Sequence, residues 1–187
     1  RQNEKGLIQD HDTEFLHDWR VSLRKVRSVL SLFKGVFDSG TEAFLKQEFS
    51  QIMKETGLLR DRDVYLLSRP EYYRLVPPGL HPGLDILFAL LEKERKKAHK
   101  SVCRTLKTKA YDRRMSLLRS QFGKPGSLAK GPSADNASRP FCGRLVMKRY
   151  EKVCKLAKSI TPRTPDDTIH ALRIQCKKLR YLIESAG

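Results

Sequence analysis

The sequence predicts an all-α protein, on the strength of three observations. Apolar residues recur with a spacing of three and four over long segments, which is the periodicity of helices with one packed face. Short alternating runs rich in β-branched residues, which would indicate strands, are nearly absent. The pattern H-x-x-R-[VI]-x-x-[RK]-K-x-R occurs twice, at 17–27 and at 170–180, which indicates an internal duplication.

Helix start and stop signals place the elements in order. Asp12 and Thr13 can cap a first helix that runs to about Phe37 and is ended by Asp38 to Gly40. Further helices are expected over 41–56, 58–68, 82–106, 111–122, 141–159 and 166–185, with breaks at Gly57, Pro70, Pro77 to Gly79, Pro162 and Pro165. The segment 123–140 contains Gly, Pro, Ser and Asn and is predicted to be a linker or a crossover.

The repeated pattern gives each of its two helices a core stripe and a basic stripe. At about 100° per residue, the polar positions of the first copy fall within roughly 80° of arc. The basic stripes consist of His17, Arg20, Arg24 and Arg27 in the first copy and His170, Arg173, Lys177 and Arg180 in the second. The expected core stripes consist of Leu16, Trp19, Leu23, Val26, Leu30, Phe33 and Phe37, and of Ile169, Leu172, Cys176, Leu179 and Ile183.

An anionic ligand is the best explanation for the first basic stripe. A solvated helix face usually alternates charge signs so that neighbouring turns form ion pairs, but no acidic residue lies between Trp19 and Lys34. The whole chain has 38 Lys and Arg against 21 Asp and Glu, a formal net charge of +17, which is typical of polyanion binders. A solvated face is the alternative interpretation of the stripe.

Other basic residues are weaker candidates for the same ligand. Lys25 and Lys178 match the pattern, but their angles point away from the core stripes. Arg95 and His99 lie on the helix after Pro82, and Lys148 and Arg149 lie on the helix after the linker; local acidic residues favour a solvated face for these four.

Several other functions are disfavoured. No apolar run is long enough to span a membrane. The four cysteines, Cys103, Cys142, Cys154 and Cys176, have no CxxC spacing and indicate reduced thiols of an intracellular protein. RNA binding is an alternative that the charge permits, although the aromatics Trp19, Phe33 and Phe37 fall on the core stripe rather than on a stacking surface.

An enzyme is a further alternative. His11-Asp12 and His17-Asp18 could form a metal-dependent phosphohydrolase site, but the cations that follow His17 disfavour a metal ion there. Asp61 and Asp63 could form an acid/base pair, but the adjacent arginines favour ion pairs. We therefore expect no catalytic residues, no metal and no cofactor.

The doubled pattern resembles the conserved-histidine alpha-helical domain family, CHAD. The resemblance is carried by 16–33 and 169–184, and by Arg60-Asp61-Arg62-Asp63-Val64, which is similar to the R-D-x-D-V segment of that family. It implies a single CHAD-like domain over 1–187, made of two pseudo-symmetric four-helix-bundle lobes around a basic groove. The first lobe would span 13–122, the linker 123–140, and the start of a second, incomplete lobe 141–187.

The resemblance also implies a partner. In this family the His, Arg and Lys residues of the pattern bind inorganic polyphosphate, so the two basic stripes become the expected ligand residues. It further implies a cytoplasmic, non-enzymatic role, in targeting to polyphosphate granules or in regulating polyphosphate metabolism.

Overall fold

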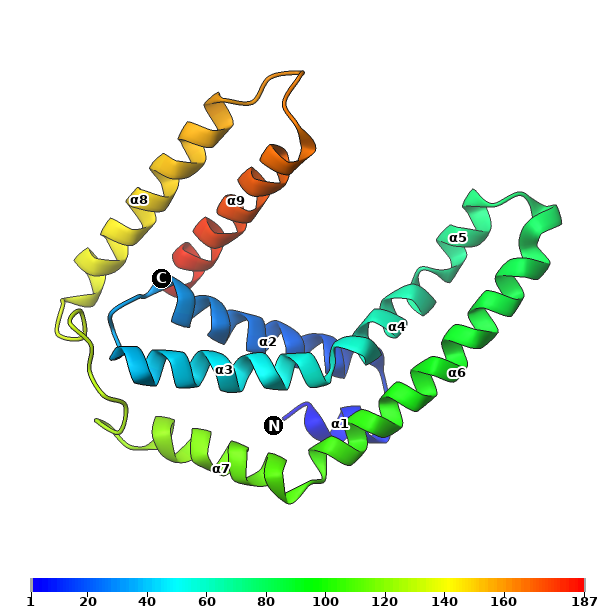
Figure 1. Ribbon diagram of the computed structural model, residues 1–187, viewed down its shortest axis with the longest axis horizontal. Coiled ribbons are helices and arrows are strands. Elements are labelled where there is room, and N and C mark those ends of the chain that lie inside the picture. The colour runs from blue at the N-terminus through cyan, green and yellow to red at the C-terminus, as the bar shows by residue number, and fades with distance from the viewer. Residues whose placement is uncertain (1, 187) are drawn as a thin grey trace. The chain divides into compact units, whose positions relative to one another are not determined.

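The computed structural model describes residues 2–186 and confirms the all-α prediction (Figure 1). In the described part of the chain no strand is formed, and the only β-type pairing is an isolated bridge between Phe37 and Lys130. The elements are α1 (Glu4–Gln9), α2 (Thr13–Leu32), α3 (Ser39–Glu55), α4 (Gly57–Leu67), α5 (Arg69–Leu75), the 3₁₀ turn η1 (Pro78–Leu80), α6 (His81–Leu106), α7 (Lys109–Gly123), α8 (Ser138–Lys158) and α9 (Asp166–Ala186).

Three local features differ from the sequence prediction. Helix α2 ends at Leu32 rather than near Phe37, because Gly35 has a positive φ of 80° and the backbone around it pairs with the loop before α8. The short helices α1 and α5 were not predicted. The helix expected over 58–68 ends at Leu67, but Pro70 then lies in the first turn of α5, where a missing N–H costs no intrahelical hydrogen bond.

The chain divides into two compact units. Unit 1 consists of Arg1–Leu23 and Glu48–Lys124, and unit 2 consists of Arg24–Gln47 and Pro125–Gly187, so α2 and α3 each contribute to both units. The pseudo-symmetric lobes over 13–122 and 141–187 stay a prediction, because compactness alone does not establish a duplicated architecture.

Unit 1 has an extensive apolar core. The face of α6 turned toward α4 and α5 buries Phe88, whose ring lies 5.9 Å from those of Tyr72 and Tyr73. Further along α6, Val102 and Leu106 are also buried, each of them stabilising the fold by about 1.5–3 kcal/mol relative to exposure.

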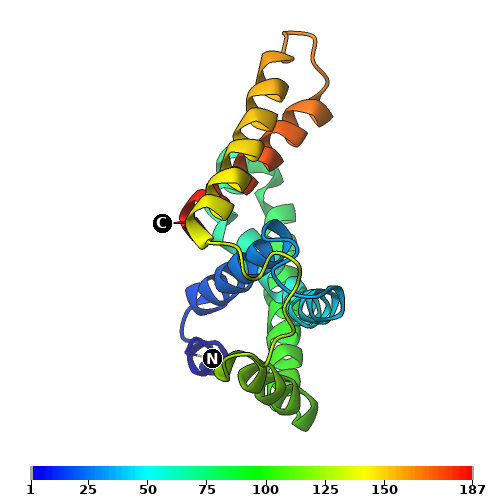
Figure 2. The same cartoon turned by 90° about the vertical axis from the view of Figure 1, so that its left-hand side faces the viewer.

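Helices α8 and α9 of unit 2 bury few side chains. Helices α8 and α9 lie side by side as an antiparallel pair (Figures 1 and 2), and none of the described residues of α8 is fully buried. The predicted core stripe of α9 is partly wrong, since Ile169 and Ile183 are 46% and 54% exposed and Cys176 is exposed. The pairing with α8 covers another arc of α9: Arg149 of α8 donates a hydrogen bond to Gln175, while Leu182 is the buried residue.

The segment before α8 is an ordered loop rather than a free linker. Asp38 donates its N–H to Ala129 O at 3.0 Å, and Gly131 donates its N–H to Val36 O at 2.9 Å. Gly131 approaches this backbone so closely that a Cβ there would overlap the carbonyl oxygens of Gly35 and Phe37.

Gly131→Ala is therefore expected to lower the free energy of unfolding by about 1–3 kcal/mol, because the added methyl can only be accommodated by moving backbone. The matched control is Gly143→Ala, where a Cβ meets nothing within 4 Å and the helix of α8 gains a better helix former. Urea unfolding of both variants measures the difference, and equal stability of the two would contradict the close approach.

Candidate anion-binding site

The basic stripe of the first copy lies on α2. This helix is capped by Asp12, whose Oδ1 accepts a hydrogen bond from the N–H of Glu14 at 3.0 Å. The core side of α2 is buried as predicted at Leu16, Trp19, Leu23 and Leu30. The neighbouring arc, which carries the basic residues, stays exposed at Arg24 and half-buried at His17, Arg20 and Arg27.

His17 has two carboxylates beside it. Ligand atoms of Glu14, His17 and Asp18 all lie within 4.8 Å of one another, so this group has the composition of a cation site. Exposed acidic groups commonly gather without an ion, and the cluster by itself assigns none. These carboxylates do reduce the local positive charge at this end of the stripe, which makes His17 a weaker anion ligand than Arg24 and Arg27.

The side chain of Arg20 forms hydrogen bonds within unit 1. Its Nη1 donates to Met53 O and to Thr56 Oγ1, both at 2.8 Å. Met53 lies in the last turn of α3, where unpaired carbonyl oxygens and the helix dipole favour a cation. Arg173, the residue at the same position of the second copy, is exposed.

The two arginines should therefore differ in their effect on stability. Arg20→Ala is expected to lower the free energy of unfolding by about 1–3 kcal/mol, because Thr56 is 1% exposed and loses a charged donor. Arg173→Ala is expected to change it by no more than about 0.5 kcal/mol, as is usual for a surface substitution. Thermal unfolding of the two variants tests this, and an equal loss would show that Arg20 has no special structural role.

Side chains from both copies of the pattern line one pocket in unit 2. It has a volume of about 250 Å³ and is lined by Arg24, Arg27, Ser28, Ser31 and Leu32 of α2 and by Lys178 and Tyr181 of α9. We call these residues the α2/α9 pocket. Three cations and the hydroxyl groups of two serines and a tyrosine thus line a small volume. This lining suits an oxyanion, because arginine offers paired N–H donors and lysine a point charge.

The basic stripe of α9 is accessible to solvent. His170, Arg173, Lys177 and Arg180 are all exposed. By helical geometry this stripe lies roughly opposite Gln175, the residue bonded to α8. Arg180 forms an ion pair on the same helix, since its Nε lies 3.2 Å from Oε1 of Glu184. The second stripe is therefore available to a ligand from solvent.

The weaker candidates have different surroundings. Lys25 and Lys148 are exposed, as expected for a solvated face. Arg149 binds Gln175, and its role in joining α8 to α9 is structural. Lys178 was a weaker candidate in the sequence, because its helical angle points away from the core stripe. In the structure it lines the α2/α9 pocket.

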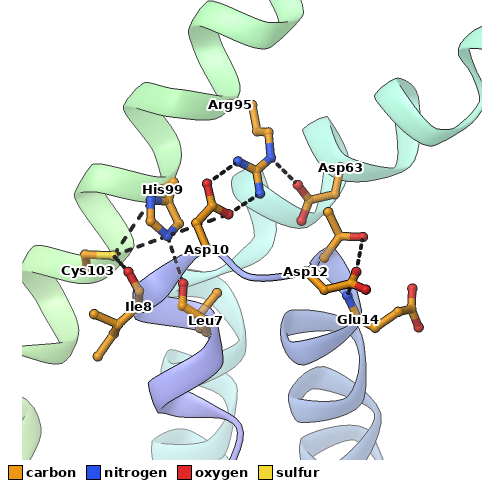
Figure 3. Close-up of polar contacts among 10 residues, drawn as sticks. Leu7, Ile8, Asp10, Asp12, Glu14, Asp63, Arg95, His99 and Cys103 are labelled. Atoms are coloured by element: carbon orange, nitrogen blue, oxygen red, sulfur yellow. Dashed lines mark hydrogen bonds and ion pairs between the residues drawn. The ribbon is translucent and has the colours of Figure 1, made fainter.

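Arg95 and His99 hold α1 against α6 (Figure 3). The Arg95 guanidinium donates two hydrogen bonds to Asp10, at 2.8 and 2.6 Å, and one to Asp63 at 2.7 Å. One turn later, His99 Nε2 lies 2.8 Å from Leu7 O. Both residues thus make polar contacts within unit 1 and do not form the solvated face that the sequence favours.

The pKa values of Asp10 and Asp63, the two carboxyl groups bound to Arg95, are shifted in opposite directions. The hydrogen bonds from Arg95 hold the pKa of Asp10 below its ordinary value. Burial raises the pKa of Asp63, which is 1% exposed, and this effect exceeds the opposing influence of Arg95. Asp63 is therefore a buried structural ion-pair partner, which agrees with the prediction of ion pairs over acid/base chemistry.

Sequence reasoning missed Ser28, Ser31 and Tyr181 as lining residues of the α2/α9 pocket. The sequence spacing could have indicated them, because the two serines follow Arg24 and Arg27 by four positions and Tyr181 follows Lys178 by three. Such spacings continue the same helix face by one further turn. The repeated pattern ends at Arg27 and Arg180, so these three residues lie outside it.

These features define an all-α protein with a cation-lined pocket between two helices that carry the same sequence pattern. The family model described as "CHAD domain" matches residues 1–187, and the chain therefore belongs to the CHAD family. Among curated proteins, none matches this chain. No helix in the described part of the chain is long and apolar enough to cross a membrane.

Two solved structures are similar to this chain. One is the CHAD domain from the plant Ricinus communis, with 26% identity and a TM-score of 0.71 over 98% of this chain. The other is PptA from Streptomyces chartreusis, with 15% identity and a TM-score of 0.67 over 95% of this chain, a likeness of fold alone. The chain spans 58% of the length of the plant structure and 67% of that of the Streptomyces structure.

Proposed function

We propose that this chain binds inorganic polyphosphate without catalysis, and that the α2/α9 pocket is the centre of the binding site. The observation that carries the proposal is the meeting of Arg24 and Arg27 with Lys178 around one small pocket. Both copies of the pattern supply these cations. Membership of the CHAD family supports the choice of ligand, because the family resemblance implies that the His, Arg and Lys residues of the pattern bind inorganic polyphosphate.

The geometry suits a chain of phosphates. Arginine forks bind two oxygens of one phosphate, and the hydroxyls of Ser28 and Ser31 can donate to further oxygens. Next to the pocket on the same helix, the exposed stripe of α9 offers cations at successive turns. A polymer with a charge on each unit can contact the pocket and this stripe together.

The aromatic residue of the pocket favours phosphate over a base. The Cζ of Arg180 lies 5.1 Å from the centroid of the Tyr181 ring, so the guanidinium covers one face of it. Nucleic acids gain much of their affinity for single-strand binders from stacking on open aromatic faces. A ligand without bases loses nothing when that face is occupied.

A non-catalytic role fits the residues that line the pocket. Among those described, none is a carboxylate or a histidine, the groups that activate water or hold a catalytic metal ion. We propose that the protein acts in the cytoplasm by attaching to polyphosphate granules or by regulating the metabolism of the polymer.

Calorimetric titration of the intact chain tests the choice of ligand. Long-chain polyphosphate is compared with single-stranded RNA of matched charge at near-physiological salt. We expect tighter binding of polyphosphate, and a steep loss of affinity for both polymers as salt is added. Equal affinity for the two polymers would contradict the proposal and favour RNA or unselective binding through net charge.

A further inference from the structure

A second pocket lies in unit 1, between α4, α5 and α6. It has a volume of about 350 Å³ and is lined by Arg62, Tyr65, Tyr72, Leu87, Phe88 and Leu91. We call these residues the α4/α6 pocket. Its walls are aromatic rings and leucine side chains, in contrast to the cations and hydroxyls of the α2/α9 pocket. A volume of this size lies in the range of small-molecule sites.

Arg62 is the charged residue of this lining, and one nitrogen of its guanidinium group makes no hydrogen bond. Its Nε is buried without a hydrogen-bond acceptor in the described structure. Burial of an unpaired donor on a charged group is unfavourable, so an anionic group close to this guanidinium would be favoured. The neighbouring Arg69 differs, because it pairs with Glu92 at 3.2 Å and lies over the ring of Phe88.

The pocket is open to solvent on its apolar side. Tyr65 is 46% exposed and Leu87 is 44% exposed, while Phe88 at the base is 1% exposed. An apolar group could therefore enter without moving the core, and would gain free energy by covering these side chains. The phenol rings of Tyr65 and Tyr72 add polarisable surface beside the guanidinium.

We propose that the α4/α6 pocket binds a small amphipathic carboxylic acid. The apolar body would cover Tyr65, Leu87 and Leu91, and the carboxylate would pair with the guanidinium of Arg62. Polyphosphate does not fit this lining, since it has no apolar part. The site goes beyond the polyphosphate proposal and does not depend on it.

Octanoate and 1-octanol are suitable probes, because they share an apolar chain and differ in charge. Titration of each into the intact, isotope-labelled chain, followed by amide NMR, gives an affinity and a location. We expect octanoate to shift signals of α4 and α6 and to bind about tenfold more tightly than octanol, as a charged hydrogen bond predicts. Equal affinity of the two probes, or shifts confined to other surfaces, would overturn the proposal.

Two variants sharpen the test. Arg62→Gln should weaken octanoate about tenfold and leave octanol unchanged, whereas the control Arg74→Gln removes an exposed cation of α5 outside the lining and should leave both unchanged. Tyr65→Ala, at an exposed position that the fold tolerates, should weaken both probes. Octanoate affinity that is insensitive to both Arg62→Gln and Tyr65→Ala would rule the site out.

Discussion

Arg95→Met is expected to lower the free energy of unfolding by about 3–5 kcal/mol, the usual cost of removing one partner of a buried ion pair. The substitution leaves the Asp63 carboxylate, which is 1% exposed, without its charged donor. It also releases Asp10, and with it the polar attachment of α1 to α6. Urea unfolding followed by helical circular dichroism measures the loss.

The matched control is Arg104→Met on the same helix, at an exposed position where the guanidinium bonds to the carbonyl oxygen of Lys100. It should change stability by no more than about 0.5 kcal/mol. A loss below about 1 kcal/mol for Arg95→Met would show that the cluster contributes little, as many ion pairs at the surface do.

The cost of Arg95→Met should depend on pH. Burial already raises the pKa of Asp63 in the folded protein, and removal of the arginine raises it further. A carboxyl group whose pKa is raised by folding favours the folded state below its unfolded pKa and loses that contribution as pH rises through the folded pKa. The difference from wild type should therefore be largest near neutral pH and shrink toward about pH 4.

The triple substitution Arg24→Ala, Arg27→Ala and Lys178→Ala is expected to weaken polyphosphate binding about 100-fold at near-physiological salt. Each cation that contacts a phosphate contributes on the order of 1 kcal/mol and releases bound counterions. The slope of log affinity against log salt should fall by about 2 units for the same reason. Titrations at several salt concentrations give both quantities.

A variant with the same loss of charge serves as control. Arg113, Arg119 and Lys124 of α7 and its C-terminal cap are exposed and lie outside the α2/α9 pocket. Their replacement by alanine should weaken binding severalfold at most. Equal losses in the two triple variants would mean that net charge alone determines affinity.

Sequence reasoning succeeded where the signal is local and periodic. The bounds of the long helices α3, α6, α8 and α9 were predicted to within a few residues, because many residues contribute to each pattern. The short helices α1 and α5 have too few turns for such a pattern. The early end of α2 depends on pairing with a loop about a hundred residues away, which periodicity cannot report.

The candidate site was predictable in part for the same reason. The cations Arg24 and Arg27 follow from helix geometry, and Lys178 was identified but ranked low. The different surroundings of Arg20 and Arg173 were not predictable. The two arginines occupy the same position of the repeated pattern, and the pattern does not show that Arg20 alone bonds to residues at the C-terminal end of α3. Nor was the binding of Arg95 to Asp10, which is separated from it by 85 positions.

If the α2/α9 pocket binds polyphosphate, Arg24 and Arg27 contact phosphate directly. An NMR titration of the arginine Nε–Hε signals of the chain with tripolyphosphate tests this contact, with Arg24→Lys and Arg27→Lys used for assignment. We expect the signals of Arg24 and Arg27 to shift first and to saturate together, while that of Arg113 barely moves. Shifts of equal size and midpoint across exposed arginines, without preference for these two, would contradict it.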